Sequence, residues 1–395
     1  MAEALASPLE FGPEQMILSA ELLQALTAGD AACLQELLSG EHRLLADGHV
    51  AITVNGGASP GAAPPLVGAS SLLGVARNGN TALHLAASRG HAELAAVVCE
   101  KAPSLVATRN RSLDTPLHCA AKAGHRKVAA RLLSTMRAGG ADEAAALLAR
   151  NRLGATALYE AVRHGYVGVV DLLMTEAPEL ASLASDDGFS PLYLAASTDR
   201  SVKMVRVLLR RSHDGTPSPA SVNGPEGRSA LHVAATRSKG TTLKSKWLKM
   251  NWKPEGPTLL TKVDSSGRTP LQFAVTYGKL DVVQLFLDEG TSMEQVHISD
   301  NRGLYPVHTA AMVGRAGIID ELVQKCPDYY ELVDDKGRNL LHCAVEHHQE
   351  TVVRHICQND AFAVLLNATD YEGNTPLHLA VKHGFPRIVS LLRRR

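Results

Sequence analysis

The segment TPLHLAV at residues 375–381 places a threonine and a proline ahead of Leu, His and small apolar residues. Closely similar segments start at intervals of 34 to 41 residues along the chain. A recurrence with this period is the mark of a repeat protein, in which each repeat packs against its neighbours. The other copies are TALHLAA (81–87), TPLHCAA (115–121), TALYEAV (156–162), SPLYLAA (190–196), SALHVAA (229–235), TPLQFAV (269–275), YPVHTAA (305–311) and NLLHCAV (339–345).

Each part of this repeated segment has a structural reason. Thr or Ser is expected to cap a short helix, and proline fits the first helical position, where no N–H is needed. Leu and the paired small residues then share one helix face, and a glycine often follows the segment as a helix stop. A second amphipathic pattern comes next, as in YVGVVDLLMTEAP (166–178). The sequence therefore predicts two short helices in each repeat.

A turn is predicted ahead of each helix pair. Asp stands three residues before glycine in DSSG (264–267), DNRG (300–303), DDKG (334–337) and DYEG (370–373), a turn-forming combination. Leu113 occupies the glycine position of one such turn, so we expect that turn to be distorted.

The repeated segment and its period resemble the ankyrin repeat. The resemblance covers roughly residues 77–395. It implies an all-α solenoid of helix-turn-helix repeats whose turns protrude as fingers, with the binding residues on the concave face.

Three parts of the chain are predicted on this basis. Residues 1–45 form a degenerate capping repeat, because 22–38 reads as helix, Gly-Asp turn and helix, and a terminal repeat must cover an exposed face. Residues 46–75 form a flexible linker rich in Gly, Ala and Pro. Residues 76–395 form nine ankyrin repeats, with insertions near 134–149, 210–222 and 236–262.

The composition argues against several classes of protein. Lys plus Arg and Asp plus Glu each total 40, so there is no basic excess of the kind that nucleic-acid binding favours. The six cysteines contain no CxxC pair, which predicts reduced thiols and a cytoplasmic location. The N-terminus lacks the basic region of a secretory signal, and no run of 18 apolar residues occurs.

Histidine is abundant, with 17 residues, but its pattern favours a structural role. A catalytic site would need one histidine beside a nucleophile or a metal, whereas here imidazoles recur at one position of the repeated segment. The resemblance implies that these rings bond backbone and hydroxyl groups at the base of the fingers, and that Tyr159, Tyr193 and Gln272 replace them in three repeats. The recurring histidines are His84, His118, His232, His308, His342 and His378.

Two further candidate sites are weak. His347, His348 and His355 lie close to Cys357 but have no third ligand in sight, so we interpret them as surface residues. The glycine-rich stretch 55–61 follows no strand and opens no helix, unlike a nucleotide-binding loop. The sequence therefore predicts no catalytic residue, no cofactor and no metal, and the protein is not expected to be an enzyme.

The basic segment 237–253 contains both tryptophans of the chain, Trp247 and Trp252. Such a segment can meet anionic lipid, an acidic partner or RNA. The alternative, which we favour, is that it is the second helix of repeat five with buried tryptophans.

A narrower resemblance rests on the phrases CEKAPSLVATRN (99–110), MTEAPELASLAS (174–185) and VQKCPDYYELVD (323–334), and on the closing stretch 372–395. They are similar to those of the plant ankyrin-repeat membrane proteins of the accelerated-cell-death type. That family combines a cytosolic ankyrin array with a C-terminal membrane domain and is implicated in defence and stress signalling. The sequence stops at Arg395 without such a domain, so membrane attachment is not carried over.

We therefore expect a non-enzymatic scaffold that binds a protein partner on its concave face, in signalling, in the cytoplasm. The alternative is the cytosolic part of a plant membrane protein at the plasma membrane, with its membrane-spanning half missing here; membrane contact would then come through that half, a partner or the segment 237–253. No nucleic-acid partner is expected. The candidate binding residues are Arg111, Arg152, Asp187, Phe189, Glu226, Arg268, Arg302, Leu304, Lys336, Arg338, Tyr371 and Glu372.

Overall fold

The computed structural model describes residues 17–39, 72–140, 145–198, 202–210, 218, 220–237, 259–289 and 293–393. The chain divides into two compact units, Met1–Asp186 and Asp187–Arg395. In the described residues the secondary structure consists of short helices, with three isolated β-bridges and no strand. The expected all-α architecture is confirmed.

In its described residues the first unit contains four pairs of α-helices. Short 3-10 helices lie in the connections that follow the second, third and fourth pairs. The helices are α1 (Ala20–Ala28), α2 (Ala31–Ser39), α3 (Ala82–Arg89), α4 (Ala92–Lys101), η2 (Pro103–Ala107), α5 (Pro116–Ala123), α6 (Arg126–Ala138), η3 (Ala146–Leu148), α8 (Ala157–His164), α9 (Val167–Glu176) and η4 (Pro178–Ser182).

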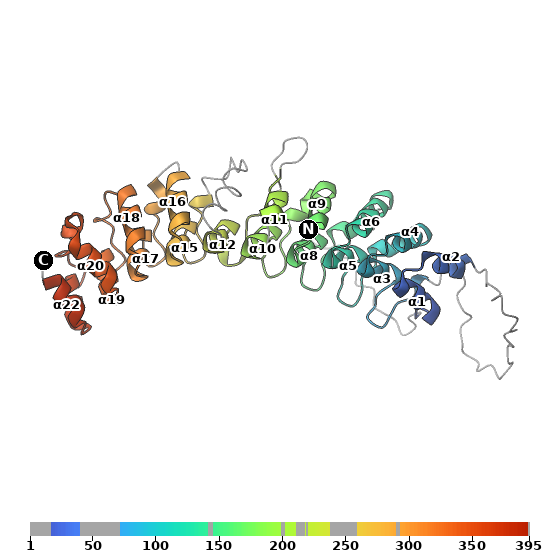
Figure 1. The fold of residues 1–395 in the computed structure, drawn as a ribbon, viewed down its shortest axis with the longest axis horizontal. Helices are drawn as coiled ribbons and strands as arrows, with labels where there is room; N and C mark the ends of the chain where they lie inside the picture. Colours follow the sequence, from blue (N-terminus) through green and yellow to red (C-terminus); the bar gives the residue numbers. More distant parts are fainter. Residues whose placement is uncertain are drawn as a thin grey trace, which may run out of the picture. The chain divides into compact units, whose positions relative to one another are not determined.

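The described residues of the second unit continue the same pairing, except after α12, where residues 238–258 lie outside them (Figure 1). Its helices are α10 (Pro191–Thr198), α11 (Val202–Leu208), η5 (Pro225–Gly227), α12 (Ala230–Arg237), α15 (Pro270–Thr276), α16 (Leu280–Glu289), η7 (Met293–Val296), α17 (Pro306–Met312), α18 (Ala316–Lys325), α19 (Leu340–Glu346), α20 (Glu350–Gln358), η8 (Asp360–Leu365), α21 (Pro376–Lys382) and α22 (Pro386–Arg393).

The start and end of each first helix follow from the repeated segment, and α5 shows how. The Thr115 hydroxyl accepts the backbone N–H of His118, and the Thr115 N–H donates to Nδ1 of the same ring at 3.2 Å. This reciprocal pair satisfies backbone donors that the first helical turn leaves without partners. The helix ends at Gly124, whose φ of 79° is left-handed and suits a residue without Cβ.

The core of each unit lies between the helices of neighbouring pairs. In α5 the side chains of Leu117, Ala120 and Ala121 are almost completely buried. Their small volume lets α5 pack closely against α3 and α8. Each fully buried leucine contributes roughly 2 kcal/mol of hydrophobic stabilisation. The stack is therefore held by many modest contacts between adjacent pairs.

The predicted divisions of the chain meet the structure only in part. The expected helix, turn and helix of 22–38 are present as α1 and α2, joined at Gly29. The linker expected at 46–75 lies outside the described residues up to 71, and its end is folded, because Leu72 is fully buried and Val75 bridges to Thr81. Of the three predicted insertions, residues 141–144, most of 210–222 and residues 238–258 lie outside the described residues. The basic tryptophan segment lies outside them from residue 238 onward.

Candidate protein-interaction surface

The turns that precede the helix pairs are built around one side-chain oxygen. In the second unit the Oδ1 atom of Asp264 accepts the backbone N–H groups of Ser266 and Arg268, both at 2.9 Å. The backbone of Asp264 also pairs with Arg268 and Gly267. We call each such five-residue turn a finger. The others centred on an Asx oxygen begin at Asn110, Asn151, Asp300, Asp334 and Asp370.

Hydrogen bonds favour the ionised form of two buried finger carboxylates, Asp264 and Asp334. Burial by itself would raise the pKa of Asp264, but hydrogen bonds from the backbone and guanidinium of Arg268 outweigh burial and lower it. The same balance lowers the pKa of Asp334, where Arg338 is the partner. These hydrogen bonds favour the charged form of the carboxylate. The sequence pattern of Asp three residues before glycine thus marks a charged, hydrogen-bonded turn.

The glycine of a finger is needed for two reasons. Gly303 has a φ of 72°, a left-handed conformation that residues with a Cβ rarely adopt. A Cβ there would also lie 2.6 Å from the backbone nitrogen of Asp335 in the next finger. The glycine therefore permits both the turn and the close approach of its neighbour.

The expected distortion at Leu113 is wrong. Leu113 itself adopts the left-handed conformation, with a φ of 59°. The turn keeps its hydrogen bonds from Leu113 N–H to Asn110 O at 2.8 Å and from Asn110 N–H to Asp114 O at 3.0 Å. The surrounding bonds fix the backbone, so the cost appears as local strain of about 1 kcal/mol instead of a changed turn.

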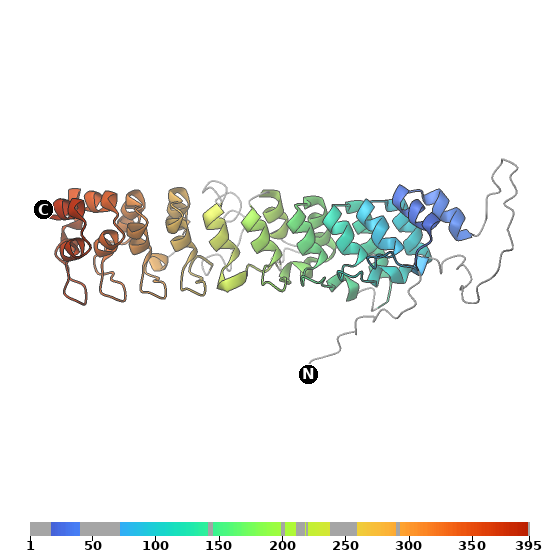
Figure 2. The same cartoon turned by 90° about the horizontal axis from the view of Figure 1, so that it is seen from below.

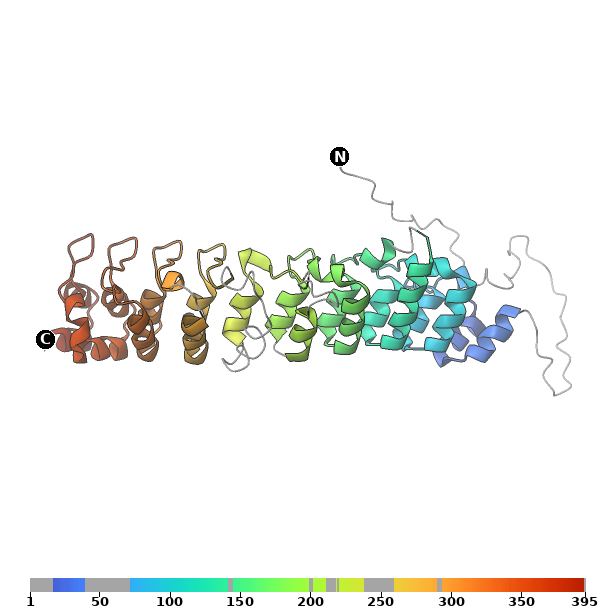
Figure 3. The same cartoon turned by 90° about the horizontal axis from the view of Figure 1, so that it is seen from above.

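Successive fingers are joined by backbone hydrogen bonds. The tip residues are the second and third residues of a finger, and in each of these bonds the N–H of the first tip residue donates to the carbonyl of the second tip residue in the preceding finger. Pro225, at a first tip position, has no N–H to donate. In the first unit the donors are Arg111, Arg152 and Asp186, at 2.9 to 3.3 Å. In the second unit they are Ser265, Asn301, Asp335 and Tyr371, at 2.8 to 3.4 Å. The fingers of the second unit project from one side of its helices (Figures 2 and 3).

Four of the recurring imidazoles tie their first helix to the finger that follows it. Nδ1 of His118 receives the Thr115 N–H, so Nε2 carries the hydrogen and donates to Ala155 O at 2.9 Å. His84, His232 and His342 make the equivalent contact, and in α15 Gln272 Nε2 donates to Leu304 O at 2.7 Å. His308 instead reaches Leu332 O at 3.1 Å. The expected structural role of these rings is thus seen directly.

Burial keeps these rings neutral. Removal from water lowers the pKa of His84, His232 and His308 to about 4 in each case, despite hydrogen bonds that favour the charged form. Burial also lowers the pKa of His118 and His342. A neutral ring with one donor and one acceptor matches the two contacts it makes. These histidines are therefore structural groups with no titration near pH 7.

The predicted binding residues separate by their place in the finger. The tip positions are solvent-exposed, as expected. In the fingers centred on an Asx oxygen, the position directly after the glycine turns back into the repeat, because its N–H binds that oxygen. The exposed tip residues are Arg111, Arg152, Asp187, Glu226, Arg302, Lys336, Tyr371 and Glu372.

Four predicted residues occupy that inward position and not a tip. Leu304 was expected to be exposed but is only 3 % exposed. The Arg338 side chain is 13 % exposed and pairs with Asp334 and Glu346. Arg268 pairs with Asp264 and lies over the ring of Phe273, and Phe189 packs edge-on against Tyr193. Leu304 and Arg338 therefore leave little surface for a partner, whereas the side chains of Arg268 and Phe189 stay partly exposed.

A buried charged network in the first unit was not anticipated from the sequence. The Lys122 ammonium lies 2.7 Å from an Asp114 oxygen and 3.7 Å from Glu160. Asn151 donates to both Asp114 and Glu160. The Glu160 side chain has no exposed surface. A carboxylate directly after the tyrosine of TALYEAV, on an otherwise apolar face, was the available signal.

The histidines near Cys357 each contact a different partner. His355 pairs with Asp320 at 2.7 Å, His347 contacts Cys343 O, and His348 stacks on Phe385. Within the described ranges, the one grouping with metal-ligand spacing is His297, Cys326 and Asp328. The glycine-rich stretch 55–61 lies outside the residues described. A search of the described helices finds none long and apolar enough to cross a membrane.

Comparison with known proteins places this architecture in a family. The profile for ankyrin repeats in three copies matches residues 22–143, 115–182, 136–218, 292–365 and 330–395. The profile for a single ankyrin repeat matches residues 266–301.

Three relatives illustrate the range of proteins that share these repeats. Protein ACCELERATED CELL DEATH 6 of Arabidopsis thaliana is 28 % identical over 245 residues, covering 59 % of this chain and 36 % of the relative. Human B-cell lymphoma 3 protein is 32 % identical over 142 residues, covering 35 % and 30 %. Human transient receptor potential cation channel subfamily A member 1 is 26 % identical over 171 residues, covering 34 % and 15 %.

The chain thus spans about a third or less of the length of each of these relatives. The profile matches cover most of the chain itself and coincide with the fingers and helix pairs described above. Ankyrin repeats of this kind mediate protein–protein binding. The chain belongs to the ankyrin-repeat family.

Proposed function

We propose that this protein is a scaffold whose fingertips and first helices, on the concave face, bind a protein partner, and that the first unit receives an acidic segment of that partner. One observation carries the proposal. The backbone of residues 76–80 forms the same turn as the fingers that begin at Asn110 and Asn151. The first tip position of these three consecutive turns is an exposed arginine: Arg77, Arg111 and Arg152. The backbone ladder keeps these positions in register.

Two further arginines strengthen this basic row. Arg109 and Arg150 are exposed and directly precede the Asn that begins a finger. Arg150 has one acidic neighbour, with Asp186 at 3.7 Å. Arginine presents a planar fork of donors that pairs with carboxylates in two places at once. A row of such groups attracts an acidic chain over a distance and orients it on arrival.

The second unit offers a different set of tips. Its exposed tip residues combine both charges with an aromatic ring, as in Lys336, Glu372 and Tyr371, the last of which is 75 % exposed. An exposed tyrosine among polar groups is typical of a protein-binding hot spot. We infer that this unit contributes contacts of mixed character to the same partner or to a second one.

The test is charge reversal on the basic row. The triple variant Arg77→Glu, Arg111→Glu, Arg152→Glu is compared with Lys101→Glu, Lys127→Glu, Arg131→Glu, which makes the same net change on exposed residues of the second helices α4 and α6. Proteins captured by the intact chain are identified by mass spectrometry and re-tested in purified form. We expect the first triple to lose them and the second to retain them, and equal loss in both triples would overturn the proposal.

The cellular role that we propose is cytoplasmic signalling. The alternative is a stress or defence role at the cytosolic face of the plasma membrane, as part of a longer membrane protein. The match to ACCELERATED CELL DEATH 6 over 59 % of this chain supports that alternative. Fractionation of the native protein, with an antibody against residues 150–200 and a mass measurement, separates the two. A 42.0 kDa soluble species supports the first role, and a longer species in membranes supports the second.

A further inference from the structure

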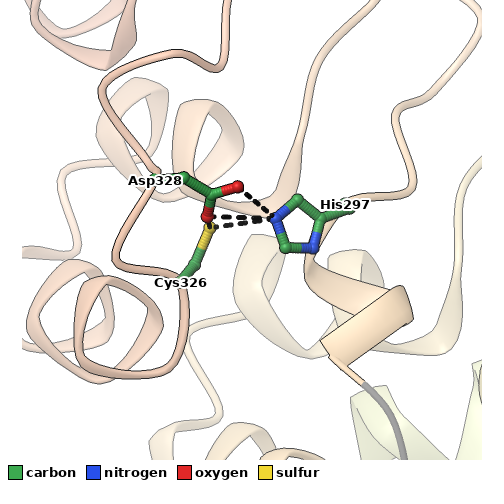
Figure 4. A group of neighbouring side chains, drawn as sticks. All are labelled: His297, Cys326 and Asp328. Carbon is green, nitrogen blue, oxygen red and sulfur yellow. Dashed lines mark hydrogen bonds and ion pairs between the residues drawn. The ribbon is translucent and has the colours of Figure 1, made fainter.

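Three side chains of different chemistry meet where two consecutive repeats of the second unit adjoin. His297 follows η7 in the connection after α16. Cys326 ends α18, and Asp328 stands two residues further on, across Pro327. Figure 4 shows the imidazole facing the thiol and the carboxylate. The meeting point lies on the connections that follow the second helices, and none of the three residues belongs to a fingertip.

The ligand atoms of these side chains lie close to one another. Nε2 of His297 is 3.1 and 3.2 Å from the two carboxylate oxygens of Asp328. The sulfur of Cys326 is 3.6 Å from the same Nε2 and 3.2 Å from Asp328 Oδ1. One nitrogen, one sulfur and one oxygen therefore form a small triangle.

This triangle has the dimensions of one face of a tetrahedral metal site. Zinc binds thiolate at about 2.3 Å and imidazole nitrogen or carboxylate oxygen at about 2.0 to 2.2 Å. A tetrahedral angle then places nitrogen and oxygen about 3.3 Å apart, and sulfur about 3.5 Å from either. The observed separations differ from these by only a few tenths of an ångström. We propose that His297, Cys326 and Asp328 bind one Zn²⁺ ion, with water as the fourth ligand.

The surroundings suit an ion that enters from solvent. Cys326 is 3 % exposed, whereas the side chains of His297 and Asp328 are 36 % and 48 % exposed. The sulfur thus forms a sheltered base, and the other two ligands flank an accessible opening. One thiolate, one imidazole and one carboxylate form a borderline donor set that suits zinc better than calcium or magnesium.

Without a cation, the same atoms can form a simple hydrogen-bonded cluster. Burial and the neighbouring Asp328 raise the pKa of the Cys326 thiol to about 12, so its S–H donates to Oδ1. Zinc binding would displace that proton: the S–H bond breaks, the sulfur keeps the electron pair and donates it to Zn²⁺, and one proton leaves to solvent. The two arrangements differ in their response to added metal.

A bound ion would fasten one repeat to the next. His297 lies three residues before the finger that begins at Asp300, and Cys326 lies in the connection that leads to the finger beginning at Asp334. Since each repeat contacts only its neighbours, a cross-link between two repeats stabilises both.

The experiment uses the full chain after dialysis against a chelator. Co²⁺ is titrated and the visible spectrum recorded, because tetrahedral Co²⁺ gives intense d–d bands and a thiolate adds a charge-transfer band. Zn²⁺ is then added in competition, and bound metal is counted by elemental analysis. We expect one Co²⁺ per chain with a thiolate band, full displacement by one Zn²⁺, and release of one thiol proton per ion bound.

The variants decide whether these residues hold the ion. Cys326→Ser should abolish the charge-transfer band, and His297→Gln and Asp328→Asn should each weaken Zn²⁺ binding at least tenfold. Cys119→Ser is the matched control, because burial raises the pKa of that thiol also to about 12 but Cys119 belongs to no such group. Circular dichroism confirms that each variant is folded. Absence of stoichiometric binding, or an unchanged cobalt spectrum in folded Cys326→Ser, would overturn the proposal.

Discussion

The buried imidazoles should make the protein sensitive to acid, and His84 offers the sharpest test. Its ring has no exposed surface, and burial lowers its pKa from 6.5 to about 4. At a pH between these two pKa values, His84 is protonated in the unfolded chain and neutral in the folded chain. The stability that a neutral His84 contributes to the folded state is therefore fully present above about pH 6.5, falls as the pH drops, and reaches its minimum below about pH 4.

The size of the effect follows from the shift. A difference of 2.5 pKa units between 6.5 and 4 corresponds to about 3 kcal/mol when the transition is complete. At pH 5 the same linkage gives a loss of about 2 kcal/mol relative to pH 7.5. His232 and His308, whose pKa values burial also lowers to about 4, add similar losses, so the comparison must isolate one ring.

The sequence itself suggests a substitution that tests His84 alone. Gln272 occupies the equivalent position in α15, receives the Thr269 N–H at 2.9 Å and donates to Leu304 O at 2.7 Å. His84→Gln should therefore keep both contacts of His84, to the Thr81 N–H and to Asp114 O, while removing the titration.

The assay is urea unfolding followed by circular dichroism at pH 7.5 and pH 5. We expect wild type to lose about 2 kcal/mol more than His84→Gln over this interval. His378→Gln is the control, because His378 makes the same cap contact to Thr375 but its ring is exposed. That variant should lose as much as wild type. Equal losses in wild type and His84→Gln would refute the reasoning.

Two other predictions concern the first unit. Leu113→Gly should raise the free energy of unfolding by up to about 1 kcal/mol, because glycine adopts the φ of 59° without strain, whereas Leu113→Ala should not raise it. A calorimetric melting temperature no higher for the Gly variant than for the Ala variant would contradict this. Lys122→Met should lower the free energy of unfolding by about 2 kcal/mol, because it leaves the carboxylates of Asp114 and Glu160 without their cation. Adding Glu160→Gln should recover part of that loss in urea unfolding. Strict additivity of the two changes would contradict the proposed network.

Most of the helical framework could be predicted from the sequence because its causes are local. A capping Thr115, a side chain at His118 that returns the bond, and a left-handed Gly124 together determine where α5 begins and ends. The Asx turns are equally local, since one side-chain oxygen binds N–H groups two and four residues away.

The direction of individual side chains was harder to predict. Leu304 and Arg338 stand beside exposed tip residues in sequence, yet the finger turns back at this position and buries them. Leu113 showed that a tertiary setting can impose a conformation that the residue type disfavours. In each case the hydrogen bonds to neighbouring repeats decide, and a single repeat does not reveal them.

Long-range groupings could not be found in the sequence. His297 and Cys326 are brought together by the stacking of two repeats whose connections differ in composition, one through η7 and one through a proline turn. Lys122 reaches Glu160 in the next repeat in the same way. No periodicity marks such pairs, because each occurs once.

The backbone ladder along the fingertips has a consequence for how this protein can change over generations. Its bonds run from the main-chain N–H of one tip to the main-chain carbonyl of the previous tip, so they involve no tip side chain. Arg111, Arg152 or Lys336 can therefore be substituted one at a time during evolution, at little risk to folding and without moving the adjacent tips. Within each repeat, different residues determine partner recognition and stability, so a new binding specificity can arise by point mutation alone.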